Sequence, residues 1–211
     1  MSIAVPGGRA TGWLLIAVGV VALASLVSLL LFFLVGGPFG TINDVGNGAV
    51  GILSGLLAWT LRSIDTSRVA TAQVVAVGVA ALGAGVTVVG SVLVVSGATG
   101  FLLAGLVSSI GFALIGLWLF ALNWWLRGQE RWSPWLPKLG IVAGGLMAVG
   151  ITTLPGILVR IDDMESAPSW VWIGFLGWIG VYVLYPVWSI CFGRVLLGRS
   201  LMPDVQGTGP Q

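Results

Sequence analysis

The chain contains no histidine, a single cysteine (Cys191) and a single lysine (Lys138). The lack of histidine removes the commonest metal and haem ligand and the usual general base at neutral pH. One cysteine forms neither an internal disulfide nor a cysteine-rich metal or redox site. These absences exclude a His-ligated haem protein and a Ser–His intramembrane protease. We therefore expect no cofactor, no metal site and no catalytic residues.

Charge is also missing from the interior of the chain. Between Trp13 and Leu197, six long apolar stretches contain no Asp, Glu, Lys or Arg. Proton-coupled pumps and many transporters carry such residues inside the membrane. Phosphotransfer enzymes need clustered acids to hold Mg²⁺, and no such cluster is visible in these stretches. The pattern favours a protein without catalytic machinery.

The remaining composition is that of a membrane protein. Of 211 residues, 57% are hydrophobic and 8% are charged, and the mean hydropathy is +1.08. A soluble domain has about a quarter of its residues charged, whereas a spanning helix needs about 20 apolar residues. The sequence predicts an all-α integral membrane protein, a single transmembrane domain over residues 1–211 with a flexible tail at 199–211. The six predicted helices lie at about 12–35, 46–61, 69–95, 101–126, 139–160 and 169–192.

The basic residues divide unequally between the two sides of a six-helix bundle. The side that carries the termini has eight basic and three acidic residues, a net charge of +5. The other side has one basic and four acidic residues, a net charge of −3, and the two sides together give the net +2 of the chain. Positive loops face the cytoplasm, so both termini are predicted to be cytoplasmic and the protein to lie in the cell membrane. The pI of 9.2 reflects these flanking residues, and no nucleic-acid partner is expected.

Small residues recur at spacings of three and four in the predicted helices. Such stripes allow close helix contact, which drives association in lipid. The stripe of the third helix contains Ala76, Ala80, Gly83, Thr87 and Gly90. We interpret these stripes as packing faces, although sliding helices of a transporter would use the same pattern.

Two segments on the outer side are candidate ligand sites. The Gly- and Asn-rich segment 36–48 contains Asn43, Asp44 and Asn47. It is interpreted either as a capped surface turn before the second helix or as a vestibule that dips into the membrane. In the fifth helix, Thr153 and Pro155 mark a kink that could make room for a cavity.

The sixth helix contributes an aromatic face. Trp178, Tyr182 and Tyr185 lie at positions i, i+4 and i+7, so they share one side of the helix and could flank a flat apolar ligand. Packing or lipid contact is the alternative. A further hypothesis is an outer latch in which Asp44 pairs with Arg160, the only predicted outer cation.

These observations predict a multi-pass protein with an interaction or accessory role, or one that binds an apolar ligand. Its partners would be the lipid bilayer and either another membrane protein or a hydrophobic small molecule such as a lipid or quinone. A facilitator or channel for a small neutral or apolar solute is the alternative. A lipid-modifying membrane enzyme is the third possibility.

Overall fold

The computed structural model describes residues 8–62, 70–130, 132–165 and 167–200, and all its regular elements are helical. The described residues form six long helical segments, called spans below, and two of them are interrupted. The fifth span consists of α5, a 3₁₀ turn and α6, and the sixth consists of α7, a π-helical turn and α8. The elements are α1 (Gly8–Val35), α2 (Phe39–Leu61), α3 (Ala70–Val95), α4 (Phe101–Leu126), α5 (Trp135–Ala148), the 3₁₀ turn (Val149–Thr153), α6 (Leu154–Leu158), α7 (Val171–Ile179), the π turn (Gly180–Leu184) and α8 (Tyr185–Ser200).

Five of the six spans in the described residues are long and apolar enough to cross a membrane. The exception is α2, whose first half carries Asn43, Asp44 and Asn47. The protein is therefore a multi-pass membrane protein, as the composition predicts. Of the predicted tail 199–211, residues from 201 onward lie outside the described part.

The start of α2 differs from the prediction. Residues 39–48 form helix rather than a loop, so α2 begins at Phe39 instead of 46. Neither Asn43 nor Asp44 caps the helix, because both lie in its second turn. Asn43 and Asn47 are four residues apart, so they share one helix face, and that face is buried. The helix pairs the backbone N–H and C=O groups of this segment with one another. It also places the Asn43 and Asn47 amides inside the bundle, where they bond to another span.

The start of the fifth span also differs. α5 begins at Trp135, four residues before the predicted 139. The tryptophans and basic residues of the connection before α5 (Arg131, Trp132, Trp135 and Lys138) predict a segment on the membrane surface. The Trp132 ring is instead buried against Phe192, with ring centroids 5.0 Å apart. Arg131, predicted to lie in the same surface segment, is outside the described residues.

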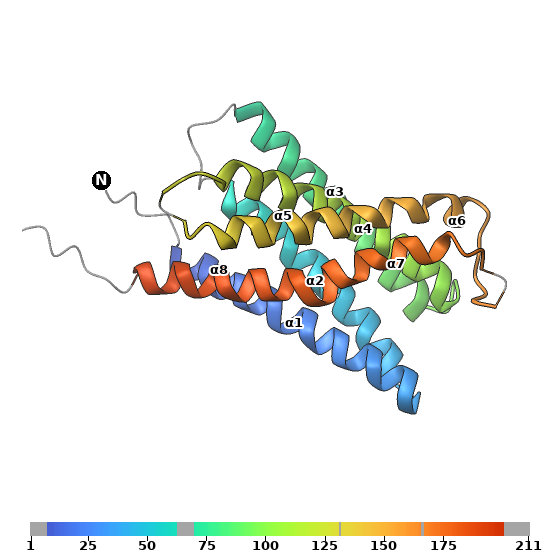
Figure 1. Cartoon of the computed structure of the whole chain (residues 1–211). Helices are drawn as coiled ribbons and strands as arrows, with labels where there is room; N and C mark the ends of the chain where they lie inside the picture. The colour runs from blue at the N-terminus through green and yellow to red at the C-terminus, as the bar shows by residue number, and fades with distance from the viewer. Residues whose placement is uncertain (1–7, 63–69, 131, 166, 201–211) are drawn as a thin grey trace, which may run out of the picture.

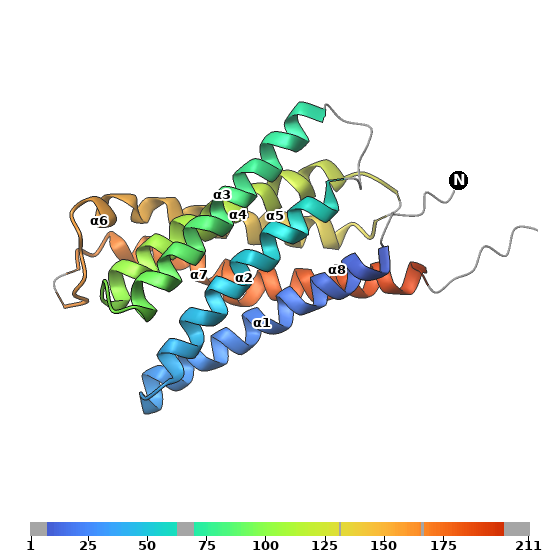
Figure 2. The same cartoon turned by 180° about the vertical axis from the view of Figure 1, so that it is seen from behind.

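The helices form two hairpins and a closing pair. α1 packs against α2, α3 against α4, and α1 also lies beside α8 (Figures 1 and 2). α1 and α8 are close where Gly12 faces Gly193 and Leu197. Toward the other end of the bundle the α1–α2 hairpin diverges from α6 and α7 (Figure 1). The candidate site lies in this divergent half.

Small residues make the closest helix contacts, which confirms the predicted packing. A Cβ on Gly83 of α3 would lie 2.6 Å from the carbonyl oxygen of Gly111 of α4. A Cβ on Gly144 of α5 would lie 2.6 Å from the carbonyl oxygen of Gly116 of α4. Only glycine allows backbones to approach this closely. α4 is therefore held between α3 and α5 by two glycine pairs.

Both interruptions have visible causes. The 3₁₀ turn in the fifth span precedes Pro155, which cannot donate a helical hydrogen bond. The Thr153 hydroxyl donates to the carbonyls of Gly150 at 2.7 Å and Leu106 at 3.3 Å. The π turn in the sixth span includes Tyr182, and one extra residue in a turn redirects the side chains that follow. π turns are frequent at functional sites.

The orientation of the bundle remains a prediction, and cysteine labelling tests it. Two exposed cation–π pairs, Arg62 over Trp59 and Arg127 over Trp124, mark the end that is predicted to be cytoplasmic. In a Cys191→Ser background, an impermeant thiol reagent applied to intact cells should label Ser169→Cys and leave Ser133→Cys unlabelled until the membrane is opened. Both sites are exposed. The reverse pattern would overturn the predicted orientation.

Candidate functional site

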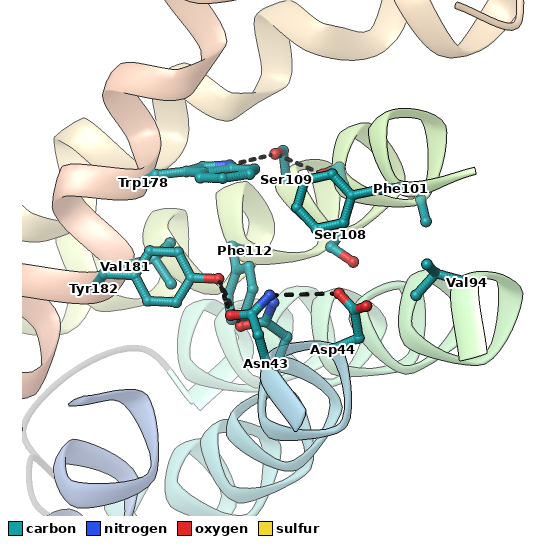
Figure 3. Close-up of a pocket in the computed structure, with 13 residues that line it drawn as sticks. Asn43, Asp44, Val94, Phe101, Ser108, Ser109, Phe112, Trp178, Val181 and Tyr182 are labelled. Carbon is teal, nitrogen blue, oxygen red and sulfur yellow. Dashed lines mark hydrogen bonds between the residues drawn. The ribbon is translucent and has the colours of Figure 1, made fainter. Parts of the chain in front are cut away.

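A small polar pocket lies between α2, α4 and the sixth span in the divergent half of the bundle (Figure 3). Its volume is about 20 Å³, which is room for about one water molecule. Polar groups come from α2 and α4, and aromatic rings come from α4 and the sixth span. The lining residues are Asn43, Asp44, Asn47, Val94, Phe101, Ala104, Gly105, Ser108, Ser109, Phe112, Trp178, Val181 and Tyr182.

Tyr182 joins the sixth span to α2 through two amides. Its hydroxyl lies 3.1 Å from Oδ1 of Asn43 and 2.9 Å from Oδ1 of Asn47. All three residues are buried. A phenol has one proton, so the two carbonyl oxygens share one donor and each keeps unused acceptor capacity. The pocket floor is therefore rich in hydrogen-bond acceptors.

Asp44 adds a carboxylate to these acceptors. It is half-buried, and its oxygen accepts a long hydrogen bond of 3.4 Å from the Asn43 amide. Arg160, predicted to be its partner, is exposed beyond α6, and the described residues include no ion pair between them. The latch hypothesis thus has no support among the described residues, because residues 39–48 form the first turns of α2 instead of a loop over the bundle.

The opposite wall comes from α4 and α7. The indole N–H of Trp178 donates to the Ser109 hydroxyl at 3.0 Å, and that hydroxyl donates to the Gly105 carbonyl at 2.8 Å. These bonds hold the Trp178 ring across the pocket. The Ser108 hydroxyl points into the space that Asp44 also faces (Figure 3).

An apolar cavity adjoins the polar pocket. Its volume is about 230 Å³, and it shares Phe101, Gly105 and Trp178 with the polar pocket. Its rim includes exposed side chains, so the cavity opens at the surface of the bundle. The other lining residues are Phe33, Leu102, Met164, Trp172 and Phe175.

Below the polar pocket the core is packed. The Tyr185 hydroxyl bonds the Ser54 hydroxyl at 2.9 Å, and the indole N–H of Trp188 donates to Oδ1 of Asn123 at 2.9 Å. Tyr185 and Trp188 are fully buried. With Tyr182, these bonds form a polar ladder along one face of the sixth span, which fixes its rotation relative to α2 and α4.

The structure brings together five of the eight predicted ligand residues: Asn43, Asp44, Asn47, Trp178 and Tyr182. The other three lie elsewhere. Tyr185 is deeper in the core, Thr153 packs at Gly174, and Pro155 is exposed at the start of α6.

Sequence reasoning missed Ser54, Ser108 and Asn123 as partners. Asn123 gave a usable signal, because an Asn surrounded by apolar residues in a membrane helix needs a hydrogen-bond partner. The sequence around Ser54 and Ser108 gives no such signal, since serine also occurs where helices simply pack closely.

The acidic loop after α6 has a structural role at Asp162. Its carboxylate accepts hydrogen bonds from the backbone N–H of Gly100 at 2.6 Å and of Leu103 at 3.0 Å. These are free donors at the start of α4, where the helix dipole also favours negative charge. Among the described residues there is no group of three or more acids or cysteines that could hold a metal ion.

Comparison with known proteins shows a similarity over part of the chain. No family model and no solved structure matches the chain. A segment of 76 residues is 38% identical to cholinephosphotransferase 1 of Gallus gallus. The match covers 36% of this chain and 22% of that protein, so this chain spans about a fifth of the relative's length.

Proposed function

We propose that this protein binds a lipid-like amphiphile from the side, in the half of the bundle that is predicted to face outward. The main observation behind this proposal is that the apolar cavity and the polar pocket share the wall formed by Phe101, Gly105 and Trp178. An apolar chain would occupy the cavity, and a polar head would reach Asn43, Asp44 and Tyr182. This proposal refines the predicted role of a binder of an apolar partner.

The size and opening of the cavity support part of a lipid as the occupant. Pockets for drug-sized ligands measure about 300–1,000 Å³, and this one is about 230 Å³. It would hold one segment of a chain, with the remainder in the bilayer. The rim residues Phe33, Met164 and Trp172 are exposed, so the chain could enter without crossing water.

The packed ladder argues against the alternative of a channel in this conformation. Leu57, Leu119 and Tyr185 are fully buried between the polar pocket and the other end of the bundle. A solute path through them would require the ladder of hydrogen bonds to open. A binding site that ends at Tyr182 needs no such movement.

Gly105→Leu is expected to weaken binding strongly. A Cβ at this position would meet only the Trp178 ring, at 3.6 Å, so the larger side chain fits without a backbone clash and projects into the cavity. Purified protein in nanodiscs would be labelled with an amphiphile that carries a diazirine in a twelve-carbon tail. We expect labelling of the α4 and α7 peptides to fall about tenfold.

The matched control is Gly78→Leu, on the exposed face of α3, where a Cβ meets nothing within 4 Å. Its labelling should equal that of the wild type. Equal labelling of the Gly105→Leu variant, with the fold intact by thermal midpoint, would contradict the proposed site.

The similarity to a cholinephosphotransferase favours a second candidate function, a part in lipid headgroup transfer. The relative is named for the transfer of a choline-phosphate group. Incubation of the purified protein with a labelled choline-phosphate donor and membrane lipid would test it. Labelled lipid above the level of a Gly105→Leu control would support transfer at this site, and its absence would leave binding as the function.

A further inference from the structure

We infer that the amphiphile bound at this site carries a positively charged nitrogen, a primary or quaternary ammonium, which sits against Asp44. This inference rests on the proposed function and specifies the headgroup. It follows from three features of the polar pocket: a carboxylate without a cation, a surplus of acceptors and a wall of aromatic rings.

The carboxylate of Asp44 lacks a charged partner among the described residues. A charge removed from water needs an opposite charge or several hydrogen bonds. Asp44 is half-buried, with one hydrogen bond of 3.4 Å, from Asn43. It lies five residues after the first residue of α2, which is about 8 Å along the helix. A cation supplied by a ligand would meet this need at the depth where lipid headgroups join their chains.

The neighbouring polar groups also favour a donor or a cation. Oδ1 of Asn43 and Oδ1 of Asn47 share the single Tyr182 proton, so both can accept a further bond. The Ser108 hydroxyl lines the same pocket and points toward Asp44 (Figure 3). No Lys or Arg of the described residues lines the pocket. An anionic headgroup would lie beside the Asp44 carboxylate, with no Lys or Arg of the described residues in the lining to offset the repulsion.

Aromatic rings complete the site. Phe101, Phe112 and Trp178 line the same pocket as Asp44. A cation over an aromatic face gains electrostatic stabilisation, and more so where water is excluded. Phe101 and Trp178 also line the apolar cavity. The chain of an ammonium amphiphile would therefore leave the polar pocket directly into the cavity.

The polar pocket itself is small, about 20 Å³. A headgroup larger than a water molecule requires some side chain to move. Asp44 is the group most free to move, because the hydrogen bond from Asn43 that holds it is long, at 3.4 Å. By contrast, Tyr182 and Trp178 are each fixed by bonds of about 3 Å to neighbouring helices.

Two diazirine probes with the same twelve-carbon tail test the headgroup. One probe ends in trimethylammonium and the other in a hydroxyl, and both are titrated into the protein in nanodiscs of neutral lipid. We expect wild-type protein to be half-labelled at about tenfold lower concentration of the ammonium probe. The preference should weaken as salt is raised.

Asp44→Asn removes the charge and preserves the shape. We expect the two probes to label this variant equally, because the variant loses affinity for the ammonium probe and keeps its affinity for the hydroxyl probe. Glu165→Gln is the matched control, because Glu165 is an exposed carboxylate at the same end of the bundle, and it should retain the preference. Thermal midpoints of both variants verify that they fold.

The outcomes separate the two proposals. Equal labelling of wild-type protein by both probes, abolished by Gly105→Leu, would overturn the ammonium inference and leave the lipid site standing. A preference that persists in Asp44→Asn would also overturn the inference. Labelling by either probe that Gly105→Leu leaves unchanged would overturn the proposed site and, with it, the headgroup assignment.

Discussion

Replacing Gly83 by leucine should destabilise the bundle by about 3 kcal/mol, because overpacking a close helix contact forces the helices apart. A Cβ at Gly83 would lie 2.6 Å from the Gly111 carbonyl oxygen and 3.0 Å from the Ile115 nitrogen. Both obstacles are backbone atoms of α4, so neither can move without displacing the helix. Unfolding by denaturing detergent in mixed micelles measures the loss of free energy.

Gly85→Leu is the control for this substitution. Gly85 lies two residues further along α3 and is exposed, and a Cβ added there would meet nothing within 4 Å. The same change there should cost nothing and could stabilise the helix by up to about 1 kcal/mol, because leucine is a better helix former than glycine. Equal tolerance at the two positions would mean that the α3–α4 contact does not form in the membrane.

Truncation of Trp188 to alanine should cost about 4 kcal/mol, through loss of packing around a large buried ring. Trp188 is fully buried and packs against Tyr185 and Phe192 with ring centroids 6.0 and 5.2 Å away. Its removal also leaves Oδ1 of Asn123 without its donor. The unfolding free energy in mixed micelles is again the measurement.

Trp124→Ala is the matched control, since that ring is 47% exposed at the end of α4. Its loss should cost less than about 1 kcal/mol. A double-mutant cycle of Trp188→Phe with Asn123→Leu isolates the hydrogen bond. We expect a coupling energy of about 0.6 kcal/mol, the average for such bonds in membranes. A coupling energy of zero would mean that this hydrogen bond does not contribute to the ladder.

Much of the architecture was predictable because length and hydropathy are local properties. An apolar stretch of about 20 residues becomes a spanning helix whatever its neighbours are. The stripe through Ala80, Gly83 and Thr87 likewise indicated a packing face from spacing alone, and all three residues are buried. The aromatic face of Trp178, Tyr182 and Tyr185 followed from helical periodicity, although only the first two line the pocket.

The start of α2 was not predictable in the same way. Gly, Asn and Asp favour turns in water, so residues 39–48 were expected to form a loop. Their helix instead aligns Asn43 and Asn47 toward Tyr182, 135 to 139 residues further along the chain. In a membrane, the hydrogen bond that a buried Asn side chain makes with another span outweighs the preference of Asn for turns.

The sequence by itself determined the protein's class, its number of long helical segments and the residues available for a site. Only the tertiary structure decided which of those residues meet. It placed Asp44 opposite Ser108 instead of Arg160, and it joined an apolar cavity to a polar pocket at Trp178. The reason is physical: hydropathy specifies where each helix lies in the membrane, whereas its rotation and tilt depend on glycine contacts and hydrogen bonds between spans.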